Sequence, residues 1–145
     1  MIKNLASNKL LATRVRRANS FGKRLRGLMF TKSFPADFEV LLFSPCNSVH
    51  TMFMRYAIDV VFLDQNFKIV HLCHQLMPGK VSPLVKGSHF VLELEAGKAR
   101  NWGIEVGDQL GLNEKEGWCS DVDSRHDVCL CCSLPDHRPR GEKNL

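Results

Sequence analysis

The residues best suited to chemistry gather in one short stretch of this sequence. Four of them lie within 14 residues, between apolar segments: Cys46, His50, Arg55 and Asp59. A nearby imidazolium lowers the pKa of a thiol, so Cys46 and His50 are candidates for a nucleophilic pair. Arg55 can hold a carboxylate or phosphate through two hydrogen bonds. A structural interpretation stands beside this one, in which the thiol is a small buried group and Arg55 pairs with Asp59.

Glu93 is a second acidic residue in an apolar setting, within the sequence Val-Leu-Glu-Leu of residues 91–94. A carboxyl group at the mouth of a small barrel can act as a base or hold a ligand. The same alternation is also typical of a strand that presents its polar residue to solvent. Both interpretations remain open from the sequence.

The polar segment 113–145 contains a dense group of potential metal ligands. These are Cys119, His126, Cys129, Cys131, Cys132 and His137. Four such ligands would complete a tetrahedral zinc site and would fold a segment poor in apolar residues. The spacings lack the two Cys-x-x-Cys pairs of common zinc sites, so a thiol-rich tail without metal is the alternative.

The apolar pattern predicts the elements that position these residues. We expect about six short strands, from the segments 10–15, 40–43, 49–54, 58–63, 67–76, 89–94 and 109–112, of which 49–54 alternates least cleanly, and two short helices at 21–29 and 96–102. The connections are too short for helical crossovers between most strands. The prediction is therefore an α+β, β-dominated domain over residues 1–112, built as a small curled sheet or barrel, followed by the polar tail 113–145.

Charge and composition exclude several classes of protein. Residues 1–32 carry nine basic residues and no acidic one, whereas acidic residues exceed basic ones in the remainder. This rules out a uniformly basic nucleic-acid wrapper, and no nucleic-acid-binding motif is present. No apolar run approaches the roughly 20 residues that span a bilayer, and basic residues interrupt any signal-like start. We expect a cytoplasmic protein whose six cysteines are thiols or metal ligands.

Five blocks of this sequence together resemble one known family. They are Arg-Leu-Arg-Gly-Leu-Met at 24–29, Pro-Cys-Asn-Ser-Val-His-Thr-Met-Phe-Met-Arg at 45–55, Ile-Asp-Val-Val-Phe-Leu-Asp at 58–64, Val-Leu-Glu-Leu-Glu-Ala-Gly at 91–97 and Gly-Asp at 107–108. In order and spacing they resemble the domain-of-unknown-function 192 family of bacteria and archaea, over about residues 10–112.

The resemblance implies a small β-rich domain and brings no established enzyme activity with it. The family's characteristic residues correspond to Arg24, Gly27, Leu28, Met29, His50, Met54, Arg55, Asp59, Asp64, Glu93, Gly97, Gly107 and Asp108. Segment 21–29 therefore belongs to the domain and is not a loose basic arm. The cysteines beyond residue 112 lie outside the resemblance.

We therefore expect a binding or accessory module with a polar pocket for a small polar or anionic ligand or a peptide. The pocket would gather His50, Met54, Arg55, Asp59, Glu93 and Arg24. One alternative is a hydrolase or transferase that uses Cys46 and His50. Another is an interaction module that binds zinc through the tail. Neither a membrane nor nucleic acid is expected as a partner.

Overall fold

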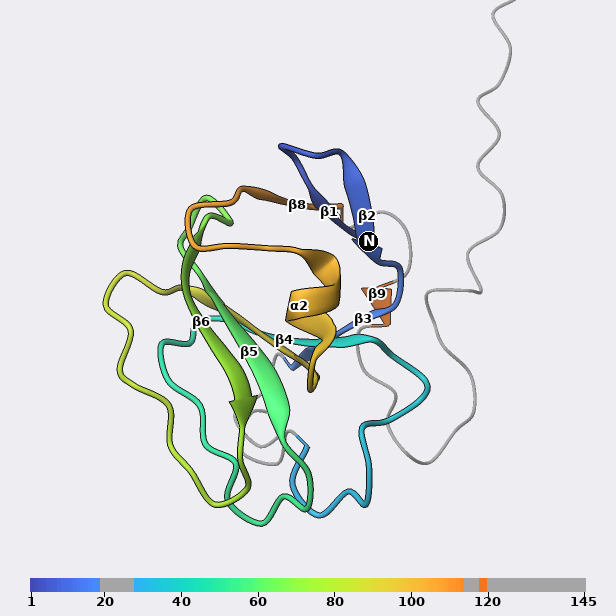
Figure 1. Ribbon diagram of the computed structural model, residues 1–145, viewed down its shortest axis with the longest axis vertical. Helices are drawn as coiled ribbons and strands as arrows, with labels where there is room; N and C mark the ends of the chain where they lie inside the picture. The colour runs from blue at the N-terminus through green and yellow to red at the C-terminus, as the bar shows by residue number, and fades with distance from the viewer. Residues whose placement is uncertain (19–27, 114–117, 120–145) are drawn as a thin grey trace, which may run out of the picture.

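Two β-sheets and one short helix make up the part of the chain that the structure describes (Figure 1). A computed structural model describes residues 1–18 and 28–113, together with the backbone of Trp118 and Cys119. The strands are β1 Ile2–Asn4, β2 Lys9–Ala12, β3 Val15–Ala18, β4 Val40–Phe43, β5 Ile58–Leu63, β6 Ile69–Leu76, β7 Phe90–Glu95, β8 Leu110–Leu112 and β9 Trp118–Cys119. The helix is α2 Lys98–Trp102.

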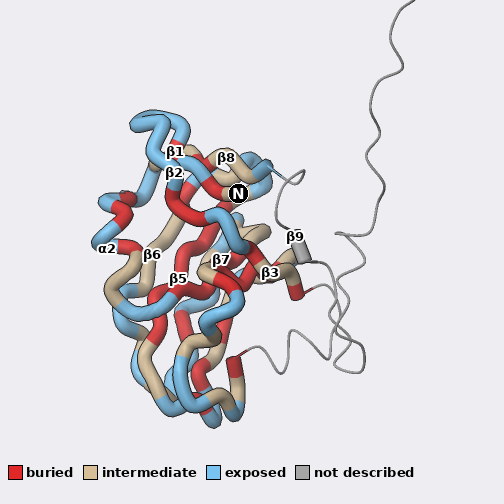
Figure 2. The backbone as a smooth tube through the Cα atoms, turned by 90° about the vertical axis from the view of Figure 1, so that its right-hand side faces the viewer, coloured by how far each residue is buried: buried red, intermediate tan, exposed pale blue. Residues whose placement is uncertain are grey.

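The larger sheet is built around β5 and β7. Its six strands follow the order β6-β5-β7-β4-β3-β9, and β5 pairs antiparallel with both β6 and β7. Every residue of β5 is buried, because both faces of this strand are covered (Figure 2). The nearly continuous apolar run of β5 is typical of such a strand.

The first hydrophobic core fills the space between this sheet and a smaller layer. That layer is the three-stranded sheet β2-β1-β8 together with α2. Ile2 and Leu110 contribute from the small sheet, and Trp102 contributes from the helix. Gly97, with φ of 88°, and Gly103, with φ of 67°, flank α2 in left-handed conformations that glycine adopts without steric cost.

A second hydrophobic core lies on the opposite face of the large sheet. Phe62 and Val60 of β5 and Val91 of β7 contribute to it, and loop residues such as Met54 pack against them. Loops rather than helices cover this face, and they come from segments 28–38, 44–57 and 77–89. These three segments form the lower part of the molecule in Figure 1, and we call them the loop end.

The structure confirms the β-dominated fold and corrects several of its details. The two sheets are separate and do not close into a barrel. The hairpin of β5 and β6, the short helix at α2 and the strand predicted at 109–112, which is β8, all form as expected. Segment 10–15 divides between β2 and β3, and β1 is an additional strand. Most of the helix predicted at 21–29 lies outside the described residues.

The strand predicted at 49–54 is a loop, because its polar groups bond across to another loop. Only His50 forms a bridge there, with Val81. The buried Thr51 hydroxyl donates to the carbonyl of Met77 at 2.6 Å and accepts the amide of Lys80 at 2.9 Å. Thr51 therefore joins segments 44–57 and 77–89 into one unit.

We predict that Thr51→Val lowers the free energy of unfolding by about 1–3 kcal/mol, because it leaves buried polar groups unpaired while keeping the side-chain shape. Urea denaturation measures the change. Thr51→Ser, which keeps the hydroxyl, is the matched control. Equal stabilities of the Val and Ser variants would show that the hydroxyl does not hold the loops together.

Candidate functional site

Asp59 lies fully buried on the β5 face that points toward α2. Its Oδ1 accepts the amide of Gln75 at 2.8 Å, and its Oδ2 accepts the amide of Ala99 at 3.0 Å. Gln75 has a φ of 49° at an irregularity in the pairing of β5 with β6. Ala99 is in the first turn of α2, where backbone amides lack partners within the helix. Asp59 therefore bonds two amides that the secondary structure leaves unpaired.

This finding overturns the predicted ion pair between Arg55 and Asp59. Both oxygens of Asp59 are bonded to backbone amides, and Arg55 is exposed. Among the described residues, the ion pairs are those of Arg16 with Asp37 and of Lys98 with Glu39, so Arg55 is in neither. The physical reason is that a buried carboxylate can be stabilised by oriented amides as well as by a cation.

Glu93 occupies the middle of the large sheet on the opposite face from Asp59. It lies in register with Leu41 of β4 and Val60 of β5, both members of the second core. The residue is only 4% exposed, and within the described part of the chain its Oε2 has no hydrogen-bond partner. Burial raises the pKa of the Glu93 carboxyl from 4.5 to about 8. This carboxyl group is therefore protonated near neutral pH.

A pair of hydroxyl groups lies close to Glu93. The Tyr56 hydroxyl and Thr31 Oγ1 are 2.6 Å apart, and Thr31 also donates to the carbonyl of Leu28. Burial raises the pKa of Tyr56, and the charge of Glu93 raises it further, against the lowering effect of the Thr31 hydrogen bond. Both residues are half-buried. The sequence prediction missed them, although Tyr56 directly follows Arg55.

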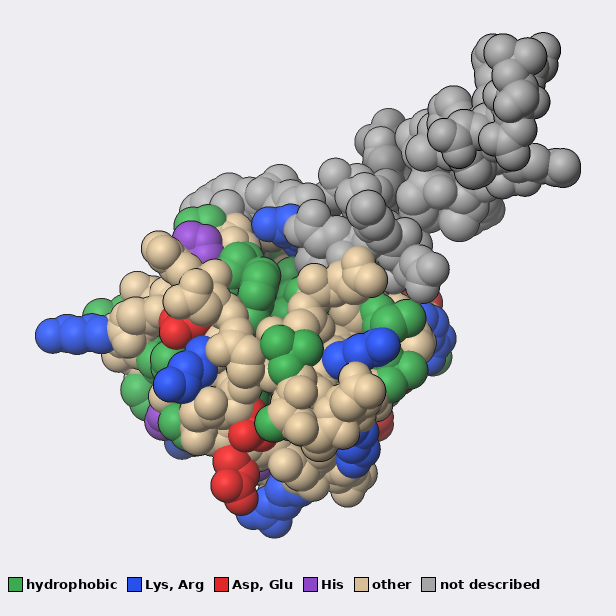
Figure 3. Space-filling model, turned by 90° about the horizontal axis from the view of Figure 1, so that it is seen from above, with side chains coloured by type: hydrophobic (Ala, Val, Ile, Leu, Met, Phe, Trp, Pro, Cys, Tyr) green, Lys and Arg blue, Asp and Glu red, His purple; other side chains and the backbone are tan. Residues whose placement is uncertain are grey.

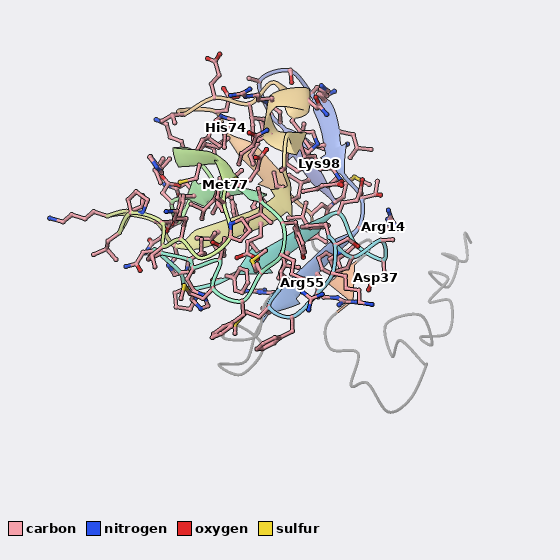
Figure 4. All side chains as sticks on the ribbon, turned by 60° about the horizontal axis from the view of Figure 1, so that its bottom comes forward. Arg14, Asp37, Arg55, His74, Met77 and Lys98 are labelled. Carbon is pink, nitrogen blue, oxygen red and sulfur yellow. The ribbon has the colours of Figure 1, made fainter. Side chains whose placement is uncertain are left out.

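The remaining predicted pocket residues divide between core and surface. Met54 is buried in the second core, while Arg55 is exposed on the same loop (Figure 4). His50 is half-buried, and its Nδ1 accepts the amide of Met52 at 3.3 Å. Asp59 and Glu93 face opposite sides of the sheet, so the six predicted residues do not converge on one pocket. Arg24 lies outside the described residues.

The contacts of Cys46 and His50 differ from those of a catalytic pair. The Cys46 thiol donates to the carbonyl of Ser48 at 3.2 Å, and the residue packs against the second core. His50 uses its Nδ1 within its own loop. No hydrogen bond between the two side chains is found in the described structure. The thiol-enzyme alternative therefore gains no support from this geometry.

A shallow polar cleft of about 390 Å³ lies elsewhere, beside the turn between β5 and β6. Asp64, Asn66 and His89 line it, and it shares no residue with the predicted pocket. Asp64 Oδ1 accepts the amides of Asn66 and Lys68, so this carboxylate closes the turn of the hairpin. We assign Asp64 a structural role.

The predicted zinc ligands of the tail cannot be placed. For Cys119 the structure describes the backbone alone, which pairs with β3, and the other five ligands lie outside the described residues. Within residues 1–18 and 28–113, no group of three His, Cys, Asp or Glu side chains could hold a metal ion. In the same part of the chain, no helix is long and apolar enough to cross a membrane.

The fold defines a class of small β domain with two hydrophobic cores. One core lies between the two sheets, and the other lies between the large sheet and the loops, where it contains a buried acid. Comparison with known proteins identifies the family to which such a domain belongs. The family model described as DUF192, "Uncharacterized ACR", matches residues 2–112. The chain belongs to this family.

Relatives in sequence come from Pyrococcus species, and a likeness of fold comes from Sinorhizobium meliloti. A UPF0127 protein of Pyrococcus furiosus is 37% identical over 112 residues, which are 76% of this chain and 96% of that protein. A UPF0127 protein of Pyrococcus horikoshii is 35% identical with the same coverage. A crystal structure from Sinorhizobium meliloti, named as a putative transcription regulator, superposes with a TM-score of 0.66 at 22% identity, covering 76% of this chain and 90% of that one. This last likeness shows the fold alone.

We predict that Asp59→Asn destabilises the protein by about 1–3 kcal/mol for each amide that loses its acceptor. The amide nitrogen of asparagine cannot accept a hydrogen bond, so at least one of the two bonds is lost. Urea denaturation measures this change. Asp37→Asn removes an exposed ion-pair partner of Arg16 and should change stability by less than about 1 kcal/mol. An Asp59→Asn variant as stable as Asp37→Asn would contradict the assignment.

The raised pKa of Glu93 should lower the free energy of unfolding as pH rises. The unfolded chain releases this proton from about pH 4.5 upward, whereas the folded protein keeps it until about pH 8. Its contribution is therefore complete below pH 4.5 and is lost through pH 8, at up to about 1.4 kcal/mol per pH unit. We predict that Glu93→Gln removes this slope from the pH profile of the free energy of unfolding. Glu95→Gln, at the exposed end of the same strand, should follow the wild type. Parallel profiles for all three proteins would refute the prediction.

Proposed function

We propose that this protein is a binding module without catalytic activity, which holds a small polar ligand or a peptide end through Glu93 at the loop-covered face of the large sheet. One observation carries the proposal. Glu93 is buried among apolar side chains, and its Oε2 is without a hydrogen-bond partner in the described structure. Buried polar groups are almost always paired, and a strongly shifted pKa beside such a group favours a functional role.

The chemistry of the carboxyl group limits the ligand class. A protonated carboxyl can donate one hydrogen bond and accept others, so a hydroxyl or amine group would satisfy it. An ammonium group would also favour the ionised form of Glu93, and the carboxyl would then release its proton. The hydroxyl groups of Tyr56 and Thr31 are suited to contact the polar part of the same ligand.

Arg55 extends the proposed site to the surface. Its exposed guanidinium adjoins Tyr56 in the chain and can bind a carboxylate or phosphate through two hydrogen bonds. Met54 supplies apolar contact on the buried side. The ligand that fits Glu93, Met54 and Arg55 best has an amine or hydroxyl group at one end, for Glu93, and an acid group at the other, for Arg55. Asp59 is not part of this proposal, because its carboxylate is already bonded on the opposite face.

Isothermal titration calorimetry near neutral pH tests the proposal. We would titrate short peptides, amino acids, polyols and phosphate esters into the full chain, in buffers of different ionisation enthalpy. A ligand with an amine should bind with release of a proton, because Glu93 changes from neutral to ionised. Glu93→Gln should abolish the proton release and weaken binding, whereas Glu95→Gln should bind as the wild type does.

Arg55→Ala provides a second readout at an exposed residue, where a loss of folding is not expected. It should weaken ligands with an acid group and leave neutral polyols unaffected. If none of these compounds binds the wild type, or if a compound binds Glu93→Gln equally well with the same proton release, the proposed function is wrong.

A further inference from the structure

The loop end carries an unusual number of exposed apolar side chains. Six large hydrophobic residues of its three segments are exposed: Phe30, Met52, Phe53, Met77, Val81 and Leu84. Phe30 and Phe53 are 67% and 66% exposed. On the rest of the described structure, the exposed large hydrophobic residues are Leu5, Leu10 and Val106. Exposed apolar side chains that gather on one part of a protein favour an interaction surface there.

Hydrogen bonds between the three segments hold these side chains on one end of the molecule. The amide of Phe30 donates to the carbonyl of Phe53 at 3.3 Å, which joins the first segment to the second. The amide of Thr51 donates to the carbonyl of Lys80 at 2.8 Å, which joins the second segment to the third. Figure 4 brings this end forward, with Arg55 and Met77 labelled on it.

The two exposed phenylalanines are held in an unfavourable backbone conformation. Phe30 has a φ of 63° and Phe53 a φ of 61°, in the left-handed region that bulky residues rarely adopt. Their rings stack with centroids 5.5 Å apart. Asparagine would adopt the same φ with less strain, and its polar side chain would be well hydrated at the surface. Neither local backbone preference nor burial explains two aromatic residues here.

The charge of the loop end is almost entirely positive. Its basic residues, all exposed, are Lys32, Arg55, Lys80 and Lys86. The single acidic residue in the three segments is Asp37, which forms an ion pair with Arg16. By contrast, the opposite end, seen in Figure 3, presents acidic and basic side chains side by side. The loop end therefore combines exposed apolar side chains with a net positive charge.

We propose that the loop end docks on the surface of an anionic lipid bilayer, with Phe30 and Phe53 inserted at the level of the headgroups. Exposed aromatic and aliphatic side chains surrounded by basic residues are the features that bind such surfaces. A peptide partner would need backbone groups free to pair or a groove to enter. The loop backbones here bond to one another instead, as in the amide of Ser82 to the carbonyl of Val49.

The inference does not depend on the proposed ligand function, and it names a partner that the sequence did not lead us to expect. The three segments that carry these basic and apolar residues are separated in the chain by whole strands. No single amphipathic segment therefore indicates this surface in the sequence. The two proposals fail separately, because ligand binding is measured at Glu93 and membrane docking at Phe30 and Phe53.

Vesicle sedimentation with the full chain tests the docking. We expect the protein to sediment with vesicles of phosphatidylcholine and phosphatidylglycerol, and at least roughly tenfold less with phosphatidylcholine alone, because the basic residues need anionic headgroups. High salt should weaken the binding. The double variant Phe30→Asn with Phe53→Asn should lose roughly tenfold or more in partitioning, since it removes two apolar side chains.

The double variant keeps backbone conformations that asparagine tolerates, so a loss of binding is not a loss of folding, and thermal unfolding checks this directly. The matched control carries Leu10→Thr with Val106→Asn, which remove exposed apolar side chains outside the loop end. It should bind as the wild type does. If the wild type stays in solution with anionic vesicles at low salt, the inference is wrong. It is also wrong if both double variants bind the vesicles alike, or if an acidic peptide binds the wild type as tightly as the vesicles do and loses that binding in the variant with Phe30→Asn and Phe53→Asn.

Discussion

The structure depends on the two hydrogen bonds that the Asp59 carboxylate accepts from the amides of Gln75 and Ala99. These amides come from the end of β6 and from the first turn of α2, and Asp59 itself is in the most buried strand. One side chain thus connects the large sheet to the helix that closes the first core. Oriented amides are the reason that a carboxylate can lie fully buried without a cation.

The two faces of the large sheet differ in how their buried acid is accommodated. On the face toward α2, the polar groups of Asp59 are satisfied, and the hydrophobic core is closed by regular elements. On the opposite face, Glu93 is buried without a partner for its Oε2 in the described structure, under loops that carry exposed aromatic and basic residues. The face toward α2 is closed by regular elements, and the loop-covered face is the one that we propose for binding. The two acidic residues are alike in sequence setting and differ only in what surrounds them.

Local sequence patterns predicted the central strands well, for a clear physical reason. The apolar run of β5 and the Asp64 turn after it are determined by neighbouring residues, and both form as expected. The partners of Asp59 are 16 and 40 residues away, so the sequence favoured the nearby Arg55 instead. Segment 49–54 has a strand-like composition, but Thr51 bonds to a loop that is 26 residues further along.

The site was predictable in part only. Glu93 could be identified as a candidate from its apolar neighbours, but its burial depends on loops that cover β7 from distant segments. Phe30 and Phe53 resemble core residues in the sequence, and only their backbone conformation and exposure set them apart. These features arise from tertiary contacts, which residue type and spacing do not encode locally.

The central claim is that Asp59 is buried with both carboxylate oxygens bonded to amides, whereas Glu93 is buried as a neutral group, which we propose as the ligand site. The most direct measurement is the ionisation midpoint of Glu93 in the intact protein, followed through the carbon-13 NMR signal of its side-chain carboxyl and assigned with Glu93→Gln. The account predicts a midpoint for the Glu93 pKa near 8. A midpoint near the ordinary value of 4.5 would mean that this carboxyl is solvated or already paired, and would contradict the account.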